Sequence, residues 1–299
     1  MLVSLLLASI SSLLVQPTPP AADPLSLTTY AIYKPRNVLS AVGETNDHFQ
    51  CKHPNLTKLM VDAGVKPLNG HVGRLDAQTS GLILVTADSW LLRGVLNWPQ
   101  VIEQYGEAEQ PMTKRYELLL AGRHEADSEK LSALGEPLTH QRNNRRYHSD
   151  AAVSVEHLGS FRDDALATGD YELIDRIDHE QVERDRAKLE RERRRPRISR
   201  ATGEVVPAFV PEGGWLTRVS VVLAQGRHHQ IRRLCKRAGL RLLHLKRVAV
   251  GPCELLPSDT PGTVRPLCRE EKQALYERCL PGLLRERYGV AHALGQDPH

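Results

Sequence analysis

The spacing of apolar and polar positions divides the first third of the chain into short strands and one helix. Residues 28–34 alternate β-forming side chains and predict a strand, followed by a turn at Pro35 and a second short extended segment. Helical apolar spacing over 54–63 predicts a helix that ends at Gly64. The apolar run 82–86 predicts a buried strand.

Two further elements follow this run. Residues 90–98 predict a helix that is capped by Ser89 or Asp88 and stopped by Pro99. Residues 113–122 predict another strand, ended by a glycine.

The last third of the chain continues this mixture. Residues 215–226 alternate as a strand does, and the helix predicted next is capped by Gly239. Residues 241–256 predict strand-like segments, and residues 268–280 predict a final helix. The helix before Gly239 has a single apolar stripe that consists of Ile231, Leu234, Cys235 and Ala238.

Residues 160–212 differ from the rest because they combine dense mixed charge with almost no apolar periodicity. They predict either an exposed helix that breaks at Pro196 or a disordered insertion. An arginine cluster lies near the end of this segment. The usual interpretation is a solvated face, and the alternative is a basic arm that follows a nucleic-acid backbone.

Charge is informative through its distribution. The net charge of +4 over 299 residues is too small to indicate a polyanionic partner by itself. However, Glu254 is the only acid between Arg227 and Ser258, a stretch that includes the basic flanks of the predicted helix. This local excess of cations suits a phosphate backbone.

The cysteines and histidines do not predict a disulfide framework or a metal site. The five cysteines are odd in number and form no C-x-x-C pair, which favours reduced thiols. The pairs Cys51 with His53 and His228 with His229 supply too few ligands at recognisable spacing for zinc.

The first 17 residues are apolar and contain neither Lys nor Arg, and Pro17 ends the run before it could span a bilayer as an ordinary helix. They resemble the apolar part of a signal sequence, and the alternative is a simple hydrophobic extension. Since reduced thiols conflict with secretion, we expect delivery to an organelle such as a plastid or mitochondrion, with the cytoplasm as the alternative. A Pro-rich linker follows at 17–24.

One carboxylate raises a question of function. Asp76 lies in a loop of small polar residues just before the buried strand 82–86. Residue types alone favour an ordinary turn, whereas loops held by a rigid sheet are also where reactive groups collect.

The remaining motifs favour the reactive site. The segments GRLDAQTSGLILVTAD, KRY, GRHHQIRRLCKRAG and LKRVAVGP, together with YKPRNVLS, resemble the pseudouridine synthases, specifically the RsuA-like branch that modifies ribosomal RNA. The form without an N-terminal S4 module is the most similar. On this basis the expected organisation is a targeting segment and linker (1–27), a catalytic domain (28–159 and 213–285), a charged insertion (160–212) and a C-terminal tail (286–299).

The resemblance implies an α+β fold, with a mixed, mostly antiparallel central sheet flanked by helices and an RNA-binding cleft across it. It also implies that a uridine within RNA is isomerised to pseudouridine without a cofactor. The sequence agrees in having no phosphate loop, dinucleotide fingerprint or metal cluster. The implied partner is RNA, with ribosomal RNA favoured; no membrane association of the mature protein and a monomer are expected.

By resemblance, Asp76 is the essential carboxylate, acting either as nucleophile on the sugar or as base at its C2′ position. Arg232 matches the arginine that pairs with it, and a bidentate guanidinium is suited to holding a carboxylate in one orientation. Tyr116 matches the aromatic that stacks against the target base, and its hydroxyl is a candidate to move a proton at C5.

Other residues are implied as substrate contacts. Arg74 matches the residue that fills the space left when the nucleotide is flipped out of its stack. Ile231 packs under the uracil or belongs to the plain core. The remaining expected contacts are Lys34, Arg227, Gln230, Arg233 and Arg247.

Two positions depart from the family pattern. Asn37 stands where a glycine is common, and Ala77-Gln78 stand where a charged pair is usual, which bears on the choice of substrate. Two other functions remain as alternatives: an RNA-binding ribosome-assembly factor on the same scaffold, and a carboxylate hydrolase, for which no second acid lies in a comparable motif. Within the enzyme reading, transfer RNA is the alternative substrate.

Overall fold

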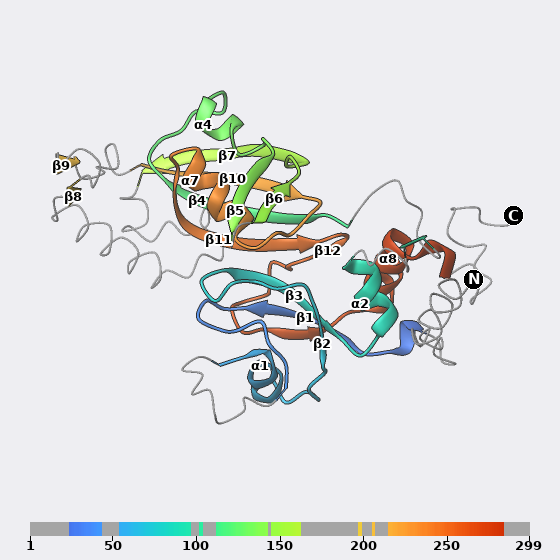
Figure 1. Ribbon diagram of the computed structural model, residues 1–299. Coiled ribbons are helices and arrows are strands. Elements are labelled where there is room, and N and C mark those ends of the chain that lie inside the picture. The colour runs from blue at the N-terminus through green and yellow to red at the C-terminus, as the bar shows by residue number, and fades with distance from the viewer. Residues whose placement is uncertain are drawn as a thin grey trace, which may run out of the picture.

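The computed structural model describes residues 24–43, 54–96, 102–103, 112–142, 145–162, 197–198, 205–206 and 215–283. A nine-stranded sheet runs through this part of the chain in the order β13-β1-β3-β11-β4-β10-β7, with β12 added to β11 and β2 added to β3 (Figure 1). Its strands are β1 (Thr29–Lys34), β2 (Gly70–Val72), β3 (Ser80–Thr86), β4 (Lys114–Ala121), β7 (Ser154–Arg162), β10 (Trp215–Leu223), β11 (Arg241–Val250), β12 (Cys253–Glu254) and β13 (Val264–Pro266). The pairings are antiparallel except for β11 with β3. The expected α+β fold with a mixed, mostly antiparallel sheet is therefore confirmed.

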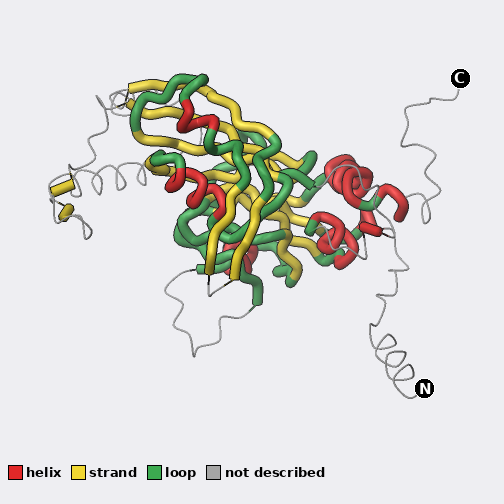
Figure 2. The backbone as a smooth tube through the Cα atoms, turned by 45° about the horizontal axis from the view of Figure 1, so that its top comes forward, coloured by secondary structure: helices red, strands yellow, loops and turns green. Residues whose placement is uncertain are grey.

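Helices cover both faces of the sheet because its central strands, such as β1 and β3, bury apolar side chains on both sides. Alternate residues of β3 enter two different cores, with Leu82 and Leu84 on one side and Ile83 and Val85 on the other. The first core includes α2 (Ser89–Val95) and α8 (Arg269–Cys279), which pack side by side (Figure 2). The second includes α1 (Leu56–Asp62) and α7 (Gln230–Arg237).

Most predicted elements are present with shifted ends. Gly64 and Gly239 follow their helices with φ of +70° and +66°, the left-handed conformation expected after a helix. Asp88 is the residue that caps α2, and its Oδ1 accepts from the backbone N–H groups of Trp90 and Leu91. Pro99, predicted to stop this helix, lies outside the described residues.

Some predictions were wrong. The extended segment expected after Pro35 is an irregular turn with a single bridge at Leu39. Strand β10 ends at Leu223, short of the predicted 226. Strand β7 continues to Arg162, which pairs with Trp215, so the sheet includes residues 160–162 that were assigned to the insertion. Most of 160–212, and its proposed helix break at Pro196, lie outside the described residues.

The sequence also missed several short elements. These are η1 (Pro24–Ser26), β2, α4 (Glu129–Ser132), the hairpin of β5 (Leu138–Arg142) with β6 (Arg145–Ser149), β7, the pair β8 (Arg197–Ile198) with β9 (Val205–Val206), β12 and β13.

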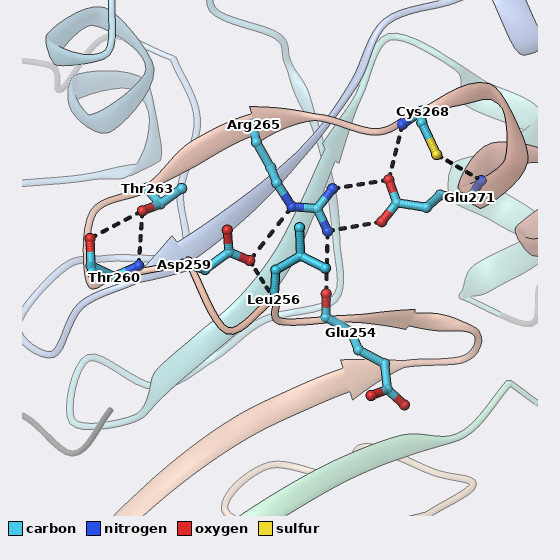
Figure 3. A network of polar contacts seen from close by, with 8 residues as sticks. All are labelled: Glu254, Leu256, Asp259, Thr260, Thr263, Arg265, Cys268 and Glu271. Atoms are coloured by element: carbon cyan, nitrogen blue, oxygen red, sulfur yellow. Dashed lines mark hydrogen bonds and ion pairs between the residues drawn. The ribbon is translucent and has the colours of Figure 1, made fainter. Parts of the chain in front are cut away.

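A polar network fastens the last part of the sheet to α8 (Figure 3). Arg265 on β13 donates two hydrogen bonds to Glu271 on α8, at 2.9 and 2.8 Å, and a third to the carbonyl of Glu254 at 3.3 Å. Glu271 also accepts from the backbone N–H of Cys268, which completes a capping box. Although burial opposes it, these hydrogen bonds hold the pKa of Glu271 below its ordinary value.

Replacing Glu271 by Gln is expected to lower the free energy of unfolding by about 1–3 kcal/mol, since a charge-assisted hydrogen-bonded pair is lost. The control is Glu277→Gln on the same helix, where the side chain accepts from the exposed Gln273. Urea unfolding at pH 7 measures both variants. The difference should shrink in acid, because the depressed pKa makes the Glu271 contribution one that is lost as the carboxylate becomes protonated. Equal stability of the two variants at pH 7 would contradict a stabilising role for the hydrogen bonds of Glu271.

Candidate active site

Asp76 lies in the seven-residue loop 73–79 that joins β2 to β3. The pairing of these strands fixes both ends of the loop, and the N–H of Thr79 donates to the carbonyl of Asp76 at 2.9 Å. The Asp76 side chain is 34% exposed, so the carboxylate is accessible yet partly enclosed.

Two side chains from the start of α7 contact the two oxygens of this carboxylate. Arg232 Nε lies 3.6 Å from Oδ2, and His229 Nε2 lies 3.2 Å from Oδ1. The structure thus brings together Asp76 and Arg232, although the guanidinium is not bidentate as expected. Its Nη2 instead donates to the Gln78 carbonyl at 2.9 Å and to Thr79 Oγ1 at 3.0 Å. Burial lowers the pKa of Arg232, and the charge of Asp76 opposes this effect.

His229 was not predicted as a site residue. Its backbone is left-handed, with φ of +54°, and its ring stacks on that of His228 with centroids 3.9 Å apart. In the sequence, these two histidines were considered only as metal ligands. The available signal was their place directly before the Gln-Ile-Arg-Arg helix start.

The turn after β1 holds the Asp76 loop from the other side. Ser40 Oγ donates to the Leu75 carbonyl at 2.8 Å and accepts from the Leu75 N–H at 3.0 Å. The N–H of Asn37 donates to the Ala77 carbonyl at 2.7 Å. The residues on both sides of Asp76 are therefore tied to one turn.

Asn37 and Gln78, two residues that depart from the family pattern, contact each other. Gln78 Nε2 donates to Asn37 Oδ1 at 2.8 Å, and Arg36 donates to Gln78 Oε1 at 2.9 Å. Asn37 has φ of +63°, a conformation that Gly and Asn tolerate best. A glycine at this position would keep the backbone but lose the acceptor for Gln78.

Comparison of Asn37→Gly with Asn37→Asp separates backbone from side chain. Both replacements tolerate the left-handed conformation, but only Asp keeps an acceptor for Gln78. We expect Asn37→Gly to lower the rate of product formation by about threefold to tenfold, the effect of one exposed hydrogen bond, and Asn37→Asp to stay near wild type. Single-turnover rates measure this, and equal rates for the two variants would contradict it.

The carboxylate opens into a cleft of about 820 Å³. Tyr116, 8% exposed, contributes from β4, and Leu223 and Leu245 contribute from the neighbouring strands. The predicted site residues that line the cleft are Arg74, Asp76, Tyr116, Arg227, Gln230, Ile231 and Arg232. Ile231 both lines the cleft and belongs to the core.

Three predicted substrate contacts do not line the cleft. Lys34 is fully buried, and its ammonium donates to the carbonyls of Pro35 and Val38 at 2.8 and 2.9 Å. Burial and the charge of Arg247 lower the pKa of Lys34 to about 7. Arg233 points along α7, where its Nη2 lies 3.3 Å from His228 Nδ1.

The expectation that Arg247 contacts the substrate differs most from the structure. Its side chain is 1% exposed, and its Nε donates to the Leu82 carbonyl at 2.7 Å. Lys246 beside it is 3% exposed and pairs with Glu117 at 3.2 Å. These cations belong to the interior of the sheet, because β11 is covered on both faces, rather than to an exposed phosphate-binding surface.

Two further properties concern the described part of the chain. Its histidines, cysteines and acids form no group of three or more that could hold a metal ion. Its helices are too short or too polar to cross a lipid bilayer.

Comparisons with known proteins agree with the motifs. A family model described as RNA pseudouridylate synthase matches residues 28–237, whereas no curated protein matches significantly. A crystal structure of a pseudouridylate synthase is similar, with 18% identity, a TM-score of 0.48 and coverage of 84% of this chain and 74% of that one. The structure of human RNA pseudouridylate synthase domain containing 1 has 13% identity, a TM-score of 0.33 and coverage of 86% and 97%.

The family match carries the assignment, because the structural similarities are remote. It spans most of the chain and includes the Asp76 loop, Tyr116 and all of α7. The chain therefore belongs to the RNA pseudouridylate synthase family, whose members are isomerases that convert uridine to pseudouridine.

Proposed function

We propose that this protein isomerises a specific uridine of ribosomal RNA, with Asp76 as the essential carboxylate. The observation that carries the proposal is the contact of both Asp76 oxygens with side chains of α7, at the mouth of a cleft that also holds Tyr116. Such contacts hold a partly buried carboxylate in one orientation, as either a nucleophile or a base requires.

The target nucleotide has to leave its stack before the glycosidic bond is accessible, which costs a few kcal/mol. Arg74 is exposed beside Asp76 and fills the vacated space. Tyr116 stacks against the uracil, and Ile231 packs under it. Arg227 and Gln230 orient the RNA at the helix start, where Gln230 Oε1 accepts from the Arg227 N–H at 3.1 Å.

The RsuA-like branch is the basis for preferring ribosomal RNA over transfer RNA. Support comes from the motif set and from the basic flanks of α7, where Arg233, Lys236 and Arg237 follow one another around the apolar stripe. These cations suit a phosphate backbone of either RNA.

Mapping pseudouridine in total RNA with and without the gene tests the proposal. Loss of one pseudouridine in ribosomal RNA when the gene is absent supports the proposal. Loss of one in transfer RNA would mean that the protein is a pseudouridine synthase whose substrate is transfer RNA. Unchanged pseudouridine together with altered ribosome assembly would favour the RNA-binding factor instead.

Delivery to an organelle is a separate part of the proposal, and it rests on the apolar residues 1–17, which lie outside the described residues. A fusion of residues 1–40 to a fluorescent protein should localise to a plastid or mitochondrion. A uniform cytosolic signal would exclude it. We further propose a monomer, which light scattering of the full chain would test.

A further inference from the structure

Lys114 is a buried lysine next to the cleft wall. It begins β4 two residues before Tyr116, so the two side chains lie on the same face of the strand. The Lys114 side chain is 8% exposed, and it makes no hydrogen bond or ion pair with any residue that the structure describes. The described part of the chain therefore offers no ion pair that would explain a charged side chain at this place.

A second buried cation lies next to it. Arg247 on β11 is opposite Tyr116 in the strand register, and within the described chain its Nη2 has no hydrogen-bond partner. Burial and the charge of Arg247 lower the pKa of Lys114 to about 8, so its ammonium is mostly protonated at neutral pH.

Glycines of the cleft wall lie against both cations. A Cβ placed on Gly226 would lie 3.9 Å from Lys114 Cδ, and one placed on Gly73 would lie 3.8 Å from Arg247 Nη1. Both glycines line the cleft. At these two places the wall is therefore backbone alone, with the stem of Lys114 behind Gly226 and the guanidinium of Arg247 behind Gly73, and neither cation lines the cleft itself.

Resting on the proposed function, we propose that the Lys114 ammonium, behind the cleft wall, stabilises the negative charge that develops on the displaced uracil. Arg247 strengthens the same positive field from beneath. The alternative anion is a phosphate of the RNA, but Lys114 shares the deep face with Tyr116, whereas Arg74 and Arg227 are exposed at the rim.

The charge arises when the bond between N1 of uracil and C1′ of ribose breaks. The electron pair of that bond stays on the uracil and is delocalised onto O2 and O4, while C1′ is taken up by the reaction at Asp76. After the ring turns, C5 bonds to C1′ while the bond from C1′ to Asp76 breaks or, where Asp76 acts as base, while the proton taken from C2′ returns to it. The proton on C5 then leaves to a base and N1 gains a proton, so the product is an isomer of the substrate. Lys114 keeps its proton throughout, and a preorganised cation of this kind is most effective in a water-poor site.

Lys114→Met and Lys114→Arg test the role in the full-length protein with its mapped RNA. We expect Met to lower the single-turnover rate at saturating RNA by about 10²-fold, with the RNA Kd within about twofold of wild type, and Arg to retain most of the rate. The matched control is Arg115→Met, on the opposite face of the same strand, where Arg115 pairs with the exposed Glu254 at 2.8 Å.

The pH profile gives a second readout that does not depend on the Met variant folding. The titratable or charged groups that face Lys114 are Arg247 from β11 and Tyr116 from its own strand, while Leu223 and Gly226 face it from the β10 side. For wild type, kcat/KM should fall as the pH rises through about 8. In Lys114→Arg this alkaline decline should disappear, because the guanidinium stays charged.

The outcomes separate this inference from the proposed function. A wild-type protein that forms no pseudouridine would overturn the proposed function. An active wild type with an unchanged rate in Lys114→Met, or an unchanged alkaline decline in Lys114→Arg, would overturn the inference alone. A weaker RNA Kd with a shallower salt dependence and an unchanged rate would identify a phosphate contact and would also reject it.

Discussion

Asp76→Asn is expected to abolish product formation, with a loss of about 10³-fold or more in single-turnover rate. Asparagine has nearly the same shape, so the loop and its contacts to the turn at Asn37 and Ser40 should persist. An amide, however, is neither a nucleophile toward C1′ nor a base at C2′. RNA binding should therefore change by less than the rate, and filter binding alongside rate measurement separates the two.

The control for this substitution is Asp62→Asn on α1, where the exposed carboxylate pairs with Lys58 at 2.9 Å. That variant should restore the mapped pseudouridine in cells that lack the gene, and Asp76→Asn should not. Restoration by both variants would reject Asp76 as the essential carboxylate.

The contact between Asp76 and α7 could be predicted because the loop that holds Asp76 and the helix α7 can each be recognised from a short stretch of sequence. The loop before β3 follows from small polar residues that precede an apolar run, and α7 follows from its stripe of Ile231, Leu234 and Cys235. What joined them was the motif resemblance, since periodicity does not specify which loop meets which helix.

The His229 contact was not accessible in this way. It depends on a left-handed backbone at His229, a conformation that a histidine adopts more often than most residues but still seldom, so the sequence gives only a weak signal for it. The pair Asn37 and Gln78 was missed as a contact for a similar reason: it joins residues 41 positions apart through side chains that sequence patterns treat as ordinary turn residues.

The exposure of two basic side chains was predicted wrongly: they were expected to be accessible and are buried. Arg247 was expected to contact the substrate, and both Lys246 and Arg247 lie in the cation-rich stretch that suits a phosphate backbone, because charged residues are seldom buried. In the structure β11 is flanked by β3 and β4 and covered on both faces, so these side chains are inside whatever their charge. Short strands such as β12 and β13 were missed because two or three residues carry no detectable alternation.

Arg232→Lys and Arg232→Met should differ in a way that follows from the two contacts of the guanidinium. Nε faces Asp76, while Nη2 holds the loop through the Gln78 carbonyl and Thr79 Oγ1. Methionine removes both contacts and leaves a partly buried carboxylate with His229 alone, so we expect a loss of about 10²–10³-fold in rate.

Lysine keeps the charge but is a single point donor, which cannot contact the carboxylate and the loop carbonyl in the same fixed geometry. The Arg232→Lys rate should therefore lie between those of Arg232→Met and wild type. Lys236→Met, on the exposed side of the same helix, controls for loss of positive charge and should leave the saturating rate near wild type. If Arg232→Lys were as active as wild type, charge alone would be sufficient at this position, and the hold of Arg232 on the Gln78 carbonyl would have no part in the reaction.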